Sequence, residues 1–129
     1  MLNTIEETIK LAGWGRRKAI RKQIELFEKN LLDDEKLLGV ATSKPNPTEQ
    51  LYITNKRIIV HKIEGMLQNN KVEIPLSSIN SINTNVKGLS SEIIIVTSNN
   101  TASVEKIPLH VAQEIKKLLD SLILKNQAN

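Results

Sequence analysis

A chain of 129 residues, 40% apolar and 25% charged, has the size and composition of one globular domain with room for a short appendage. It contains no cysteine, which excludes disulfides, thiolate nucleophiles and thiolate metal sites and suits a cytoplasmic protein. The formal net charge is +4, and the longest apolar run, residues 93–96, is too short to span a membrane.

Residues 1–32 are predicted to form a helical arm in two parts. In the first part, apolar residues recur at helical spacing at Leu2, Ile5, Ile9 and Ala12. Thr4 and Glu7 have the spacing of a capping box, which favours a helix start near Thr4. Two glycines within residues 13–15 then interrupt the helix.

The second part of the arm is an amphipathic helix predicted from Arg16 to the acidic residues 33–34. Its narrow apolar stripe consists of Ile20, Ile24, Phe27 and Leu31. Positive charge is concentrated at its start, in a basic cluster that comprises Arg16, Arg17, Lys18, Arg21 and Lys22.

Short strands are predicted to follow at residues 37–43, 50–53, 58–64, 72–74, 82–86, 92–97 and 102–107. An amphipathic helix opens at Pro108, and a polar tail occupies residues 125–129. No glycine-rich loop that opens a helix lies between the strands, which argues against a parallel sheet. We therefore expect an α+β, mainly β fold: an antiparallel meander of about seven strands that curls into a barrel, with one end closed by the C-terminal helix.

Two of these strands, at 58–63 and 93–96, are apolar on both faces. A strand with one face in water does not show this pattern. We expect the helical arm to cover the outside of the sheet, and a second subunit in a homo-oligomer is the alternative. Candidates for contact with a hydrophobic partner are Trp14 and whichever of Ile59, Ile63, Ile94 and Val96 the arm leaves exposed.

Three motifs occur in order along the chain: LLGVATS at 37–43, LYITNKRIIV at 51–60 and IPLSSI at 74–79. Together they resemble the bacterial pleckstrin-homology-like (PH-like) domains, and among these the YokE-like group. The resemblance covers residues 33–124 and implies a seven-stranded barrel or bent sandwich with a C-terminal capping helix. It implies little about chemistry, beyond a bacterial or phage-associated binding module. Eukaryotic relatives that bind inositol phosphates carry basic residues on both sides of the first hairpin, where this chain has only Lys44.

The tetrapeptide TNKR at 54–57 has two interpretations. Thr54 and Asn55 are residue types that bond to nearby backbone in turns, which would leave Lys56 and Arg57 as solvated edge charges. In the second interpretation, Lys56 and Arg57 contact an anion at the tip of the hairpin. The residue types favour the turn, because turn geometry alone accounts for them.

The basic cluster has three interpretations. It can be a solvated helix face, as most surface charges are. It can bind an anionic membrane, with Trp14 at the boundary between headgroups and acyl chains. It can bind nucleic acid, since two helices joined at a glycine turn superficially resemble a helix-turn-helix.

No catalytic constellation is recognisable in the sequence. His61 and His110 lack acidic residues at metal-ligand spacing, and the acidic residues 33–35 are interpreted as a solvated corner. We predict no enzyme activity, no metal and no cofactor. The predicted function is a cytoplasmic interaction module that binds a protein partner. The alternatives are peripheral attachment to the inner membrane face, or nucleic-acid binding, through the basic cluster.

Overall fold

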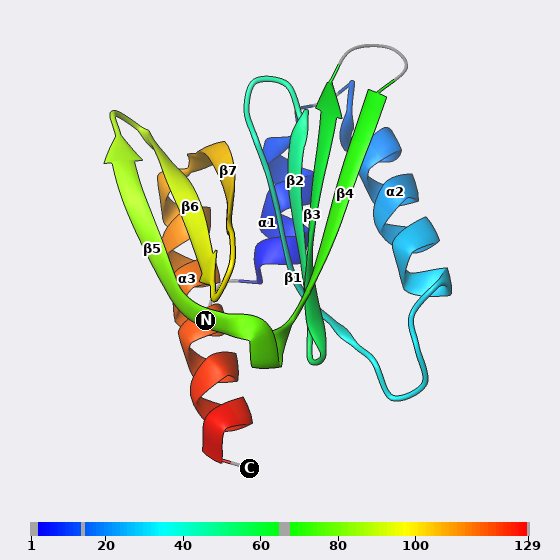
Figure 1. Cartoon of the computed structure of the whole chain (residues 1–129). Coiled ribbons are helices and arrows are strands. Elements are labelled where there is room, and N and C mark those ends of the chain that lie inside the picture. The colour runs from blue at the N-terminus through cyan, green and yellow to red at the C-terminus, as the bar shows by residue number, and fades with distance from the viewer. Residues whose placement is uncertain (1–2, 14, 65–67, 129) are drawn as a thin grey trace.

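The computed structural model describes residues 3–13, 15–64 and 68–128. In chain order the elements are α1 (Thr4–Leu11), α2 (Arg17–Lys29), β1 (Leu37–Thr42), β2 (Glu49–Thr54), β3 (Arg57–Glu64), β4 (Gln68–Pro75), the short 3₁₀ helix η1 (Leu76–Ser78), β5 (Ile79–Lys87), β6 (Ser90–Thr97), β7 (Thr101–Pro108) and α3 (Leu109–Ala128). In Figure 1, the β5–β7 sheet and α3 lie on one side of the β1–β4 sheet, and α2 lies on the other. This arrangement confirms the predicted bent sandwich.

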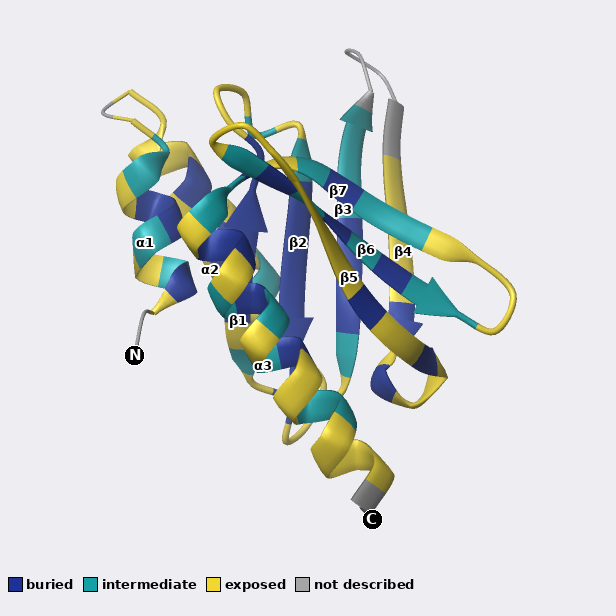
Figure 2. Ribbon diagram, turned by 90° about the vertical axis from the view of Figure 1, so that its left-hand side faces the viewer, coloured by how far each residue is buried: buried dark blue, intermediate teal, exposed yellow. Residues whose placement is uncertain are grey.

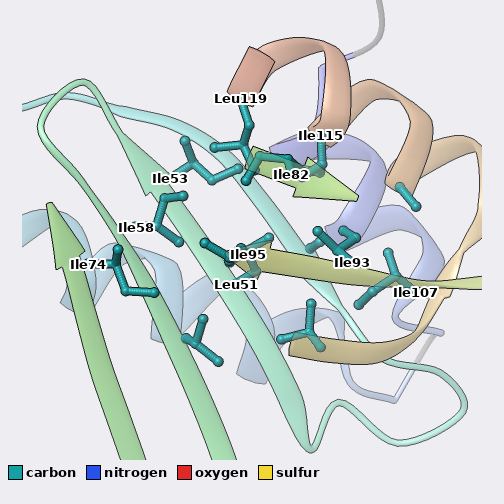
Figure 3. Packing of buried hydrophobic residues seen from close by; sticks show 14 of the residues in the cluster. Leu51, Ile53, Ile58, Ile74, Ile82, Ile93, Ile95, Ile107, Ile115 and Leu119 are labelled. Carbon is teal, nitrogen blue, oxygen red and sulfur yellow. The ribbon is translucent and has the colours of Figure 1, made fainter. Parts of the chain in front are cut away.

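The strands form two antiparallel sheets, one in the order β1-β2-β3-β4 and one in the order β5-β6-β7. Because side chains alternate across a strand, one face of each sheet points into a shared core. That core is aliphatic, as the scarcity of aromatic residues predicts, and Figure 3 shows Leu51, Ile58, Ile93 and Ile95 meeting within it. Helix α3 adds Ile115 and Leu119, both fully buried, so the predicted C-terminal cap is confirmed.

The helical arm packs on the outer face of the β1–β4 sheet. Its isoleucines Ile9, Ile20 and Ile24 form a second cluster with Val40, Tyr52 and Ile59 of the first three strands. The prediction that the arm covers the second apolar face of β3 is therefore confirmed. The same expectation is wrong for β6, where Ile94 and Val96 are half-buried and do not belong to this cluster. Ser81 and Asn83 lie beside them in register on β5, so their surroundings are partly polar.

Helix α1 also closes the open edge of β1. The Thr8 hydroxyl donates to the Val40 carbonyl oxygen at 2.8 Å, and the Val40 N–H donates to Thr4 Oγ1 at 3.3 Å. The predicted capping box is therefore wrong: Thr4 lies inside the helix, and the cap is Asn3. The Asn3 Oδ1 accepts from the N–H groups of Ile5 and Glu6 at 3.0 and 3.2 Å.

Two helix ends differ from the sequence-based boundaries. Helix α2 ends at Lys29 rather than near 33–34, because Asn30 leaves helical geometry and its side chain donates to the Leu26 carbonyl oxygen at 2.9 Å. Helix α3 continues to Ala128, so the described part of the polar tail extends that helix.

Candidate partner-binding groove

The hairpin at 54–57 holds the segment that joins the arm to β1. The Asn55 Oδ1 accepts the Lys36 N–H at 2.7 Å, and Asn55 Nδ2 donates to the Asp34 carbonyl oxygen at 2.9 Å. Lys56 Nζ donates to the Asp33 carbonyl oxygen at 2.9 Å. The polar side chains of this hairpin thus bind the chain itself.

A buried ion pair also joins the hairpin at 54–57 to the segment before β1. Arg57 binds Glu35 through two hydrogen bonds, from Nε to Oε2 at 2.8 Å and from Nη2 to Oε1 at 3.1 Å. The Glu35 side chain has no exposed surface and also accepts from the Thr54 hydroxyl at 2.7 Å. Arg57 Nη1 donates to the exposed Glu73 at 2.7 Å. The prediction of a solvated acidic corner at 33–35 is therefore wrong for Glu35. The interpretation of Arg57 as a solvated edge charge is wrong as well, because Arg57 is paired with this buried carboxylate.

Burial by itself would raise the pKa of Glu35, but its hydrogen bonds outweigh that cost. Arg57, the Leu32 N–H and the Thr54 hydroxyl all donate to the carboxylate, and together with the charge of Arg57 they lower its pKa to about 2. The bond to Glu35 also raises the pKa of Arg57. Both groups are therefore charged across the neutral range.

We expect this ion pair to make the fold acid-sensitive. The difference between the ordinary pKa of 4.5 and about 2 corresponds to about 3 kcal/mol. Since the folded pKa is the lower one, this stability is present above pH 4.5 and is lost as the pH falls toward 2. Urea unfolding of the wild type and of Glu35→Gln between pH 4.5 and pH 2 measures this pH-dependent part of the free energy of unfolding. Glu35→Gln should show a shallower loss, whereas Asp34→Asn, a control in the same loop, should follow the wild type. Equal acid dependence of Glu35→Gln and the wild type would contradict this assignment.

Two arginines of the basic cluster also bind within the chain. The Arg16 guanidinium contacts the Pro45 carbonyl oxygen and donates to Asn46 Oδ1 at 2.8 Å. Arg17 donates from Nε and Nη2 to the Lys10 carbonyl oxygen at 3.2 and 3.0 Å. These bonds fix the junction of α1 and α2 against the β1–β2 loop. Trp14, the aromatic candidate at this junction, lies outside the described residues.

The other three members of the basic cluster are exposed to solvent. The side chains of Lys18, Arg21 and Lys22 make no hydrogen bond or ion pair with residues 3–13, 15–64 or 68–128. The structure thus separates the cluster into two arginines with local contacts and three cations that are open to a partner. A polyanion contact by these cations, or by Lys56 and Arg57, stays a prediction.

A groove of about 350 Å³ runs between α2 and the outer face of β3 and β4. Its floor is apolar: Phe27 stacks on Tyr52 with ring centroids 4.6 Å apart, and Ile59 lies beside them. Burial raises the pKa of Tyr52 to about 12, and its hydroxyl donates to Gln50 Oε1 at 2.9 Å. The floor is therefore uncharged.

Two leucines border this groove and remain open to solvent. Leu26 is 64% exposed and Leu32 is 56% exposed. Neither leucine belongs to the apolar stripe from which the sequence predicts the buried face of the arm. The signal was present: Leu26 stands on the polar side of an amphipathic helix, where a leucine has no role in the core.

Lysine side chains stand on both sides of the groove. On α2, Lys22 and Lys29 stand four residues before and three after Leu26, so they flank it on one helix face. On the sheet side, Lys71 and His61 lie in register on β4 and β3 and line the groove. The one lining carboxylate, Glu73, is paired with Arg57.

The two histidines have different positions. His110 Nε2 lies 3.0 Å from Glu7 Oε1 and joins α3 to α1, whereas His61 lines the groove. Within the described residues no three His, Cys, Asp or Glu side chains gather to hold a metal ion. No helix among these residues is long and apolar enough to cross a bilayer.

The family model for the bacterial PH domain matches residues 31–121. The chain belongs to the bacterial PH domain family. Assignment to the YokE-like group stays a prediction. The match begins after α2, so the groove lies between the PH domain and a helix outside it. No curated protein matches the chain.

Two solved structures share the fold of this bacterial PH domain. One is a pleckstrin homology domain from Shewanella amazonensis SB2B, with 18% identity and a TM-score of 0.57 over 77% of this chain and 83% of that one. The other is a DUF1696 family protein with a pleckstrin-homology domain from Shewanella loihica PV-4, with 15% identity and a TM-score of 0.57 over 80% and 95%. At these identities the likeness concerns the fold alone.

Proposed function

We propose that this bacterial PH domain protein is a non-catalytic cytoplasmic module that binds a protein partner in the groove beside α2. PH domains generally mediate binding to other molecules, and one observation supports the groove as the binding site. Leu26 and Leu32 are largely exposed at the rim of a concave site whose floor is apolar. Exposed apolar side chains around a preformed groove are typical of a docking surface.

The charges around the groove favour an acidic partner segment. Lys22 and Lys29 would meet carboxylates, while bulky apolar side chains would enter between Leu26, Leu32 and Ile59. Complementary charge steers encounter and fixes register, and apolar burial supplies most of the affinity. The partner is therefore a peptide segment that alternates acidic residues with leucine or aromatic anchors.

Selection of a random displayed-peptide library on the full chain tests this proposal. We expect enriched peptides to carry acidic and bulky apolar residues, and to perturb the amide NMR signals of Gln23, Asn30 and Ile59. The double variant Leu26→Ser and Leu32→Ser should weaken their binding about tenfold or more, because two apolar contacts are lost. Leu124→Ser, which alters an exposed leucine of α3, is the matched control.

Peptides that bind the Leu26/Leu32 variant as tightly as the wild type would contradict the proposal. A second result would also contradict it: no peptide is enriched, and the Leu26/Leu32 variant still sediments with anionic liposomes. That second result would favour membrane attachment instead.

Membrane attachment is the second candidate, and one observation favours it. The loop that Arg16 holds brings Lys44 to the junction of the arm, and the Lys44 N–H donates to the Lys106 carbonyl oxygen at 3.0 Å. Lys18 and Lys10 are exposed near the same end. Cations from three segments thus adjoin one another and could face anionic headgroups. Nucleic acid requires the same charges and stays the third alternative.

A further inference from the structure

The two edges of the β1–β4 sheet differ. At the β1 edge, Thr4 and Thr8 of α1 bind the outward-pointing backbone groups of Val40. Strand β4 forms the other edge, and within the described residues no strand pairs with its open side. An open edge strand presents unpaired N–H and C=O groups to another chain.

The alternation of hydrogen bonds shows which residues of β4 present these groups. Leu76, directly after β4, donates its N–H to the Lys56 carbonyl oxygen at 3.1 Å, toward β3. Every second residue before Leu76, including Val72, therefore points its backbone groups toward β3 as well. The intervening residues Lys71 and Glu73 direct their N–H and C=O groups away from the sheet.

Charge then selects one way for β4 to pair with a copy of itself. Lys71 and Glu73 flank Val72, and all three residues are exposed. Antiparallel pairing centred on Val72 places Lys71 opposite Glu73 of the second copy, and this contact occurs twice. Pairing centred on Lys71 or on Glu73 would instead place like charges opposite each other, which destabilises a sheet.

We propose that two copies of this chain pair antiparallel along β4 about a two-fold axis at Val72. Lys71 and Glu73 of the second copy exchange backbone hydrogen bonds, and their side chains form an ion pair on the outer face. The Glu73 Oε2 is available for this pair, because Oε1 accepts from Arg57. A lysine on an edge strand disfavours pairing with most strands, but here Glu73 of the second copy would neutralise its charge.

The surroundings of β4 leave room for the second strand. A cleft of about 630 Å³ lies between β4 and the β6–β7 hairpin, and Figure 2 shows that hairpin extending beyond β4. Its lining offers uncharged hydroxyl and amide groups from Thr97, Ser98, Asn99, Asn100 and Thr101. Val72 faces this cleft, so the valines of the two copies would meet there.

A single cysteine tests the proposed register, because the chain has no other thiol. The two copies of Val72 form a pair without mutual hydrogen bonds, whose Cα atoms lie about 4.5 Å apart, within the span of a disulfide. We expect Val72→Cys to oxidise to a covalent dimer roughly tenfold faster than Val86→Cys in a glutathione buffer. Val72 and Val86 have similar exposures of 48% and 58%, and Val86 lies on β5.

Sedimentation velocity of the full chain across a range of concentrations tests the ion pairs. We expect the wild type to form dimers and Lys71→Glu to weaken them about tenfold, because two attractive contacts become repulsive. The swapped variant Lys71→Glu with Glu73→Lys should recover dimerisation, and thermal unfolding confirms that each variant folds.

Three results would overturn the proposal: a wild type that stays monomeric at all concentrations, a dimer that Lys71→Glu leaves unchanged, or equal oxidation of the two cysteine variants. The dimer does not depend on the proposed groove function. Leu26→Ser with Leu32→Ser should dimerise like the wild type.

Discussion

A chain that begins at Asp33 is expected to lose its soluble, cooperatively folded state. Removal of the arm deletes the buried side chains of Ile9, Ile20 and Ile24 and uncovers those of Val40, Tyr52 and Ile59 on the outer sheet face. Each fully buried aliphatic side chain contributes about 1.5–3 kcal/mol. The total loss is on the order of 10 kcal/mol, which equals the whole stability of a typical domain. Size-exclusion chromatography with light scattering and a thermal melt measure the result.

The matched control for this truncation keeps the arm in place. In the full chain, Ile24→Ser should lower the free energy of unfolding by about 2–5 kcal/mol, since it empties a buried site. Leu26→Ser, two residues along the same helix, removes an exposed leucine and should change stability by less than about 0.5 kcal/mol. A truncated chain that elutes as a monomer and melts like the full chain would show that the arm is dispensable.

Loss of Arg57 is expected to be the most damaging change of a single charged residue. Arg57→Ala leaves the Glu35 carboxylate buried without its partner, and such a change costs about 3–5 kcal/mol at neutral pH. The same change should raise the pKa of Glu35, because burial is no longer offset. Urea unfolding at pH 7 and pH 5 measures both effects, and the deficit should be smaller at pH 5.

Two further variants distinguish the loss of this buried ion pair from the loss of any positive charge. Arg21→Ala removes an exposed arginine of α2 and should cost less than about 0.5 kcal/mol. Joint replacement of Glu35 and Arg57 by methionine should recover much of the loss, because neither charge then stays buried alone. If Arg57→Ala proved as mild as Arg21→Ala, the ion pair would contribute little to the fold.

The sequence predicted the antiparallel strands, the capping helix and the cover over β3, because these depend on local periodicity. Ile20, Ile24 and Phe27 recur at helical spacing, and Ile58 and Ile59 on opposite faces of one strand required a cover. The ends of α2 and the cap of α1 were missed, since a single side-chain bond decides each of them. Asn3 competes with Thr4 for the cap, and only the contact of Thr4 with β1 shows which residue is used.

The site was less predictable because it depends on contacts between distant segments. Glu35 and Arg57 are 22 residues apart, and no spacing rule joins a junction residue to a hairpin tip. The TNKR motif predicts turn chemistry, which Thr54 confirms by accepting the N–H groups of Lys56 and Arg57. Asn55 instead binds residues 34 and 36, and that role requires the fold. The groove beside α2 likewise exists only once Leu26 is placed against β3 and β4.

The threonines of α1 also determine how far self-assembly can proceed. A sheet with two open edges can recruit copies at both, and such growth leads to filaments. Here Thr4 and Thr8 occupy the backbone groups of Val40 at one edge, so the proposed pairing uses the β4 edge of the β1–β4 sheet. In the proposed dimer, pairing of the two β4 strands uses the β4 edge of each copy and gives a sheet of eight strands. By protecting the β1 edge, the arm would limit self-assembly to a dimer. Variants that weaken the contact of α1 with β1 would be expected to form filaments.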